Sequence, residues 1–80
     1  MMRIQIQYFA MLAEKRGLTD EWLTVETHNL AALYEALAKQ HGFPLPHTSI
    51  RPAVNDSFRA WDYPLQEGDR VVFVPPVSGG

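Results

Sequence analysis

The chain ends in two glycines, Gly79 and Gly80, shortly after a run with the pattern of a β-strand. Glycine has no Cβ atom, so this pair can enter a channel too narrow for any side chain. The reactive group it presents is the α-carboxylate of Gly80, which ATP can activate as an acyl-adenylate toward a sulfur, nitrogen or oxygen nucleophile. Because an acyl-adenylate hydrolyses in water, the activating enzyme must enclose it. The alternative is a frayed terminus without a role.

Two prolines, Pro75 and Pro76, precede this end and favour a stiff, extended conformation. The six residues from Pro75 to Gly80 span at most about 20 Å when extended. We therefore divide the chain into a globular domain, residues 1–74, and an extended C-terminal tail, residues 75–80. Such a tail can leave the body of the protein and reach into a second protein.

Other catalytic chemistry finds little support in the sequence. The chain has no cysteine, so it has neither a thiolate nucleophile nor a disulfide framework. Its three histidines lack the spacing of helical metal ligands, its serines lack a local nucleophile motif, and its acidic residues are scattered. Trp61 and Tyr63 could stack on bases, but a net charge of −2 does not suit a nucleic-acid binder. We expect no permanently bound cofactor and no metal.

The bulk composition indicates one small globular domain. Eighty residues with 46% hydrophobic and 20% charged residues are typical of a single folded unit with little stability to spare. No apolar stretch approaches the length needed to span a membrane, and no signal peptide is visible at the N-terminus. We expect a cytoplasmic protein.

The spacing of apolar residues predicts the elements that must position the tail. Residues 3–9 and 21–26 alternate as half-buried strands, with Ile4, Ile6 and Tyr8 facing the core and Phe9 facing outward. A short helix is expected over residues 10–16. The main helix has apolar residues at helical spacing, with Thr27 or Asn29 as its cap and Gly42 after its end, the apolar set being Leu30, Leu33, Tyr34 and Leu37.

The second half predicts two more strands, over residues 51–55 and 70–74, separated by an irregular segment and a turn at Gly68. The order of elements indicates an α+β protein of the β-grasp, or ubiquitin-like, class, with a mixed sheet packed on one main helix. A single helix can cover only one face of the sheet. We therefore expect Val72 and Val74 to face outward beside Phe9 as an exposed apolar patch, which is typical of a partner site.

Several of these residues together resemble the small subunit of molybdopterin synthase, the sulfur carrier of molybdenum-cofactor synthesis. The Pro-Pro-x-x-Gly-Gly end of residues 75–80 is the specific part of this resemblance. Weaker matches are the Tyr8-Phe9-Ala10 run, the Ala53-Val54-Asn55 strand, and Leu65 through Asp69 before the last strand. The resemblance covers essentially the whole chain.

The resemblance implies a non-catalytic carrier whose tail bears the sulfur. An adenylating enzyme would use ATP to activate Gly80, and sulfur from a persulfide donor would convert it to a thiocarboxylate. The carrier would then dock on the large catalytic subunit, in a heterotetramer, and deliver sulfur to cyclic pyranopterin monophosphate. By the same resemblance, Gly79 allows the tail to enter the partner protein. The resemblance also implies a partner interface that comprises Phe9, Phe58, Val72, Val74, Pro75 and Pro76.

Other functions of the same fold remain open at this point. A ubiquitin-like modifier would use the same carboxylate to form isopeptide bonds with lysines of target proteins. A sulfur carrier of the thiamine pathway would use the same chemistry, although those chains are usually shorter and lack the Pro-Pro approach. A plain interaction module would leave the tail without a role.

Overall fold

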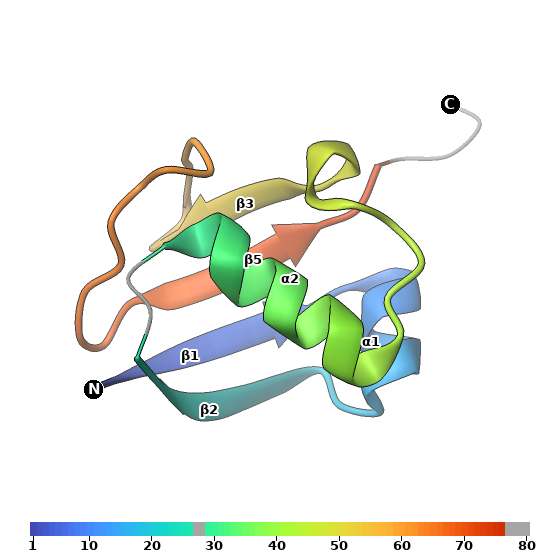
Figure 1. Ribbon diagram of the computed structural model, residues 1–80, viewed down its shortest axis with the longest axis horizontal. Coiled ribbons are helices and arrows are strands. Elements are labelled where there is room, and N and C mark those ends of the chain that lie inside the picture. The colour runs from blue at the N-terminus through green and yellow to red at the C-terminus, as the bar shows by residue number, and fades with distance from the viewer. Residues whose placement is uncertain (27–28, 77–80) are drawn as a thin grey trace.

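The computed structural model describes residues 1–26 and 29–76 and forms a mixed sheet with one main helix across it (Figure 1). The elements are β1 (Met2–Tyr8), α1 (Ala10–Arg16), β2 (Asp20–Val25), α2 (Leu30–His41), the 3₁₀ turn η1 (His47–Ser49), β3 (Arg51–Val54), β4 (Ser57–Phe58) and β5 (Arg70–Val74). The predicted β-grasp class is confirmed. No helix in the described ranges is long and apolar enough to cross a membrane.

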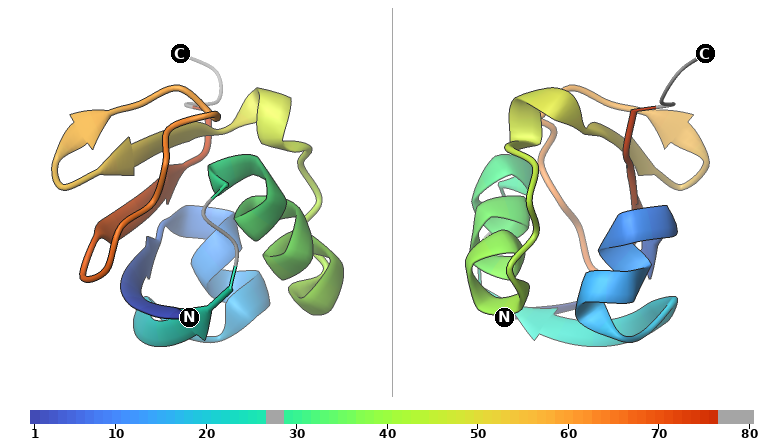
Figure 2. Two further views of the ribbon diagram at one scale, coloured as in Figure 1. Left: turned by 60° about the vertical axis from the view of Figure 1, so that its left-hand side comes forward. Right: turned by 90° about the vertical axis from the view of Figure 1, so that its right-hand side faces the viewer.

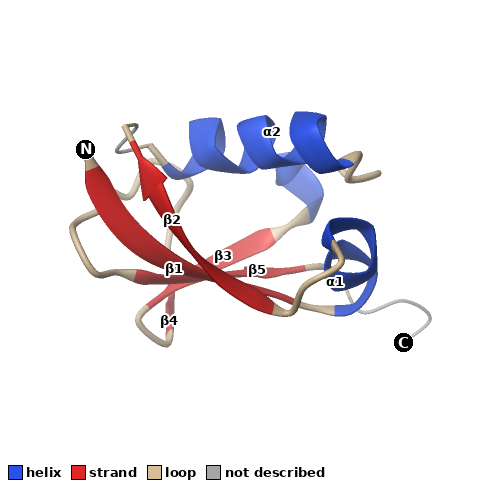
Figure 3. Ribbon diagram, turned by 90° about the horizontal axis from the view of Figure 1, so that it is seen from below, coloured by secondary structure: helices blue, strands red, loops and turns tan. Residues whose placement is uncertain are grey.

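The strands lie in the order β2-β1-β5-β3-β4, with β1 and β5 parallel and every other pair antiparallel. The first and last strands of the chain are therefore neighbours in the middle of the sheet, as their apolar content predicted. Helix α2 lies across one face, and the views from the side show no helix against the other (Figures 2 and 3). We call this second face the outer face.

The two helices begin and end where the sequence predicted. Gly17 and Gly42 follow α1 and α2 with positive φ angles of 83° and 72°, a conformation that glycine adopts without strain. Asn29 caps α2, because its side chain accepts a hydrogen bond from the Ala32 N–H at 3.0 Å. Thr27, the alternative cap, lies outside the described residues.

The core lies between α2 and the inner face of the sheet. The predicted core residues of the first strand and of α2 are all buried. At its centre Tyr34 contacts Phe73 edge to face, with ring centroids 5.1 Å apart, and its hydroxyl donates to the Leu45 carbonyl at 2.8 Å. Trp61 stacks on Phe73, which shows that it packs against the core as the absence of a basic groove suggested.

Two expectations about the sheet need correction. The segment after β3, predicted to be irregular, contains the two-residue strand β4, which pairs with Ala53 and Val54. Its alternation is too short to be read from sequence, and the turn residues Asn55 and Asp56, with φ angles of 52° and 73°, form the tight connection. The second correction concerns Val72 and is described with the outer face below.

Candidate functional site

The last strand holds the start of the C-terminal tail in a defined place. β5 lies between β1 and β3, with Phe73 opposite Tyr8 and Val74 opposite Arg51. The strand ends at Val74 as predicted, and Pro75 and Pro76 belong to no helix or strand. Gly79 and Gly80, the predicted reactive residues, lie outside the described residues.

A polar network anchors the other end of β5. Asp69 is a buried carboxylate that accepts hydrogen bonds from the Gln66 N–H and from the Asn55 side-chain amide, each at 2.9 Å. The side-chain Oδ1 of Asn55 in turn accepts a hydrogen bond from the Arg70 backbone N–H at 3.0 Å. The network ties the β3–β4 turn to the turn that precedes β5. Asp69 therefore has the structural role expected for a turn residue.

The sheet register brings most of the predicted interface residues onto the outer face. Residues directly opposite each other on paired strands share a face. Val72 lies opposite Ala53, and Ala53 lies opposite Phe58, so the three form one row across the sheet. Continuing the register of β1 and β5 by one residue places Phe9 beside Val74. We call these residues the outer-face patch: Phe9, Ala53, Phe58, Val72 and Val74.

The members of this patch differ in how much surface they expose. Phe9 and Phe58 are 51% and 55% exposed, and Val74 is half-buried. Val72 faces outward as predicted but is only 8% exposed, so the prediction that it is exposed is wrong. A valine in a central strand has neighbours on both sides, whereas the two phenylalanines lie at the margins of the sheet. Most of the exposed apolar surface of the patch therefore belongs to these two rings.

Arg51 shares this face and was not singled out by the sequence analysis. Its guanidinium carbon lies 4.1 Å from the centroid of the Phe58 ring, a cation–π contact that fixes the side chain beside the patch. Its position opposite Val74 places it at the end of β5. No local pattern in the sequence indicates that Arg51 belongs to this surface. Its contact with Phe58 depends on the pairing of β3 with β4, a strand that was not predicted.

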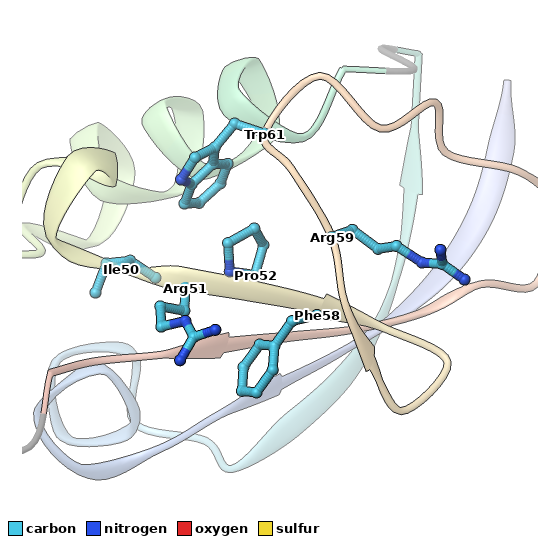
Figure 4. Close-up of a pocket in the computed structure, with 6 residues that line it drawn as sticks. All are labelled: Ile50, Arg51, Pro52, Phe58, Arg59 and Trp61. Carbon is cyan, nitrogen blue, oxygen red and sulfur yellow. The ribbon is translucent and has the colours of Figure 1, made fainter.

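An open cavity of about 350 Å³ lies beside β3 and is lined by Ile50, Arg51, Pro52, Phe58, Arg59 and Trp61 (Figure 4). In this view Arg51 and Phe58 extend to one side of the β3 ribbon, Pro52 and Trp61 lie on the other, and Arg59 points away along the loop. The lining holds no carboxylate, histidine or serine. It therefore offers no acid–base pair and no nucleophile.

A network of ionised side chains and one tyrosine hydroxyl lies at the β2 edge of the sheet. Glu21 accepts hydrogen bonds from Arg16 at 2.7 and 2.8 Å and from the Tyr8 hydroxyl at 2.7 Å. The Arg16 guanidinium holds the pKa of Glu21 below its usual value, and burial, with the Glu21 bond, raises the pKa of Tyr8. These groups attach α1 to β1 and β2.

Residues 1–26 and 29–76 contain no candidate metal-binding site. No group of three or more histidine, cysteine or acidic residues in these ranges could hold an ion. His41 lies against the Phe43 ring and His47 against the Trp61 ring, while His28 lies outside the described residues. The two described histidines therefore contribute to packing.

Comparison with known proteins places this geometry in a family. The model of the ThiS family matches residues 6–80, which include the terminal glycines. The molybdopterin synthase sulfur carrier subunit of Escherichia coli is 31% identical, over 96% of this chain and 99% of its own length.

Solved structures of related proteins share this fold. Molybdopterin converting factor subunit 1 from Pyrococcus furiosus has a TM-score of 0.80 at 25% identity, over 96% of this chain and 100% of its own. A complex of subunits 1 and 2 of molybdopterin-converting factor from Helicobacter pylori has a chain with a TM-score of 0.67 at 24% identity, covering 99% of this chain and 100% of that one, which shows the shared fold.

The fold and its outer face define a β-grasp protein of the small carrier type. The chain belongs to the ThiS family. The resemblance to the small subunit of molybdopterin synthase is thereby confirmed, since the curated relative is a sulfur carrier subunit of that enzyme. The chain is a carrier subunit and not an enzyme on its own, as predicted.

Proposed function

We propose that the chain carries sulfur on the carboxylate of Gly80 for the synthesis of molybdopterin. The observation that carries the proposal is the family match through residue 80, together with the likeness to the Escherichia coli sulfur carrier over 96% of the chain. The pairing of β5 with β1 and β3 supports it, because the tail starts after Val74, at a defined place beside the outer-face patch.

The chemistry begins with a partner enzyme that uses ATP, so the carrier itself needs no bound cofactor. An oxygen of the Gly80 carboxylate attacks the α-phosphate of ATP, which releases pyrophosphate and leaves an acyl-adenylate. A persulfide sulfur then attacks the acyl carbon and expels AMP. A thiol cleaves the resulting acyl disulfide and releases the thiocarboxylate. Gly79 lets the tail enter the enclosed site where water is excluded.

Delivery takes place on a second partner, the large catalytic subunit, within a heterotetramer of two small and two large subunits. The complex of subunits 1 and 2 from Helicobacter pylori supports a partner of this kind. The thiocarboxylate sulfur attacks cyclic pyranopterin monophosphate, and two such deliveries supply the dithiolene. Phe9, Phe58 and Val74 form the docking surface, with Pro75 and Pro76 directing the tail. Activation of the carrier and delivery of its sulfur take place in the cytoplasm.

Intact mass spectrometry tests the proposal. Incubation of the chain with its activating enzyme, ATP and a persulfide donor should raise its mass by the difference between sulfur and oxygen, located at Gly80. A variant lacking Gly80 should remain unmodified, and Arg59→Leu, which leaves the tail intact, is the matched control. An unchanged mass of the full chain beside an active enzyme contradicts the proposal.

Genetic complementation distinguishes the competing functions of the tail. A strain without its molybdopterin carrier should regain the cofactor with the full chain and not with the variant lacking Gly80. Isopeptide conjugates in cell extract that disappear with Gly80 would instead identify a protein modifier. Equal rescue by both forms would show that the tail has no role.

A further inference from the structure

Arg51 occupies an unusual position for a charged side chain. It lies on the outer face opposite Val74, directly beside the hydrophobic residues of the outer-face patch, and it is exposed. The Phe58 ring beneath its guanidinium holds the side chain against the patch instead of letting it extend into solvent. Figure 4 shows the two side chains together on the same side of β3.

The charge of Arg51 is not balanced within the described part of the chain. Arg16 pairs with Glu21 and Arg70 pairs with Asp56, whereas none of the ion pairs between described residues includes Arg51. Arg59 also lies over an aromatic ring, that of Tyr63, but it points away from β3 (Figure 4). Arg3 shares the outer face but lies over the Trp22 ring, towards the other end of β1 from Phe9. Arg51, opposite Val74 and over the Phe58 ring, is thus the arginine that a partner covering the outer-face patch would also cover.

Covering this arginine sets a condition on the partner. Removing an ionised group from water is unfavourable unless the new surroundings pair it and satisfy its hydrogen bonds. A guanidinium is matched best by a carboxylate, which can accept two parallel N–H hydrogen bonds. A purely apolar partner surface would fit Phe9, Phe58 and Val74 and would leave Arg51 unpaired.

We propose that the partner surface docking on the outer-face patch presents an aspartate or glutamate carboxylate to Arg51, and that this partner is the large catalytic subunit. The inference rests on the proposed function, which supplies the identity of the partner. Phe58 then has two roles, because it contributes apolar area and holds the guanidinium in place. The chain as a whole has a net charge of −2, so this cation attracts an acidic group locally and helps to fix the docking orientation.

Replacing Arg51 with an apolar residue distinguishes a partner surface that carries a carboxylate from one that is purely apolar. In calorimetric titrations of the full chain with the large subunit, Arg51→Leu should raise the Kd roughly 30-fold or more, the effect of leaving a buried carboxylate unpaired. Arg51→Lys should bind with intermediate affinity, since lysine retains the charge but not the planar fork. Arg59→Leu is the matched control and should change the Kd by less than about threefold.

A charge exchange identifies the carboxylate directly. Arg51→Glu should abolish detectable binding, and replacing the matching acidic residue of the large subunit with arginine should restore it. Circular dichroism of each variant should match the parent, because Arg51 is exposed and outside the core.

Three results would overturn the inference. Binding of Arg51→Leu as tight as or tighter than the parent would mean that the partner surface is apolar at this point. Equal weakening by Arg51→Leu and Arg59→Leu would indicate only general electrostatic attraction. A parent chain that fails to bind the large subunit would overturn the proposed function and this inference together, which distinguishes that failure from the other two.

Discussion

The two faces of the sheet are built from the same strands but differ in how far their aromatic side chains are buried. On the inner face, Phe73 is fully buried beneath α2 and contacts the rings of Tyr34 and Trp61. On the outer face, Phe9 and Phe58 leave half of their surface in water. Both faces carry large apolar side chains, so the hydrophobicity of a single residue does not distinguish core from docking surface. The difference lies in whether an element of the same chain covers the face.

This comparison has a direct thermodynamic test in a pair of phenylalanines. Phe73→Ala should lower the free energy of unfolding by about 3–5 kcal/mol, because it leaves a cavity among Tyr34 and Trp61. Phe58→Ala should lower it by less than about 1 kcal/mol, since the ring is exposed and loses mainly its contact with Arg51. Urea unfolding followed by circular dichroism measures both. Similar losses would show that the outer face is also part of the core.

A smaller effect is expected from the network that anchors β5. Asn55→Ala should lower the free energy of unfolding by about 1–3 kcal/mol, since the buried Asp69 carboxylate loses a donor and the Arg70 N–H an acceptor. Asn55→Gly removes the same hydrogen bonds but keeps the positive φ of 52° without strain, so it should cost less. Urea titration of both variants measures these free energies of unfolding. Two variants as stable as the parent would mean that β5 is held by its neighbouring strands alone.

The smallest effect concerns Glu21, whose network attaches α1 at the edge of the sheet. The bond from Arg16 lowers the pKa of Glu21 below its ordinary value of 4.5 in the folded state. The stabilisation is therefore present above that value and is lost as the pH falls through the lowered pKa. Glu21→Gln should make stability less dependent on pH in this acidic range.

Urea midpoints measured from neutral pH to about pH 3 test the sign of this effect. Glu14→Gln, which neutralises an exposed carboxylate on the same helix as Arg16, is the control. A Glu21→Gln variant that loses stability on acidification as steeply as the parent would show that the ion pair contributes little.

Local patterns predicted most of the fold because they depend on neighbouring residues. The alternation of Ile4, Ile6 and Tyr8 indicated a strand with one buried face, and α2 has its apolar stripe, its Asn29 cap and its Gly42 end where expected. These features follow from backbone geometry and hydrogen bonding within a few residues. The central place of β1 and β5 followed from their apolar content.

Features that depend on register could not be predicted in the same way. β4 has two residues, too few to show a period, and it gains its place only by pairing with β3. The cation–π contact of Arg51 with Phe58 depends on that pairing. Val72 was expected to be exposed, but whether an outward-facing residue is covered depends on its neighbours across the strands.

Local patterns predicted the order of the main strands and helices, the helix ends and the Gly-Gly pair on which the proposed chemistry depends. Which outward residues are accessible, and that Arg51 lies among them, became clear only from the folded sheet. The two kinds of feature differ in the separation of the interacting residues along the chain. Helix periodicity and capping act over three or four residues, whereas the outer-face patch joins residues from β1, β3, β4 and β5 that only the sheet brings together.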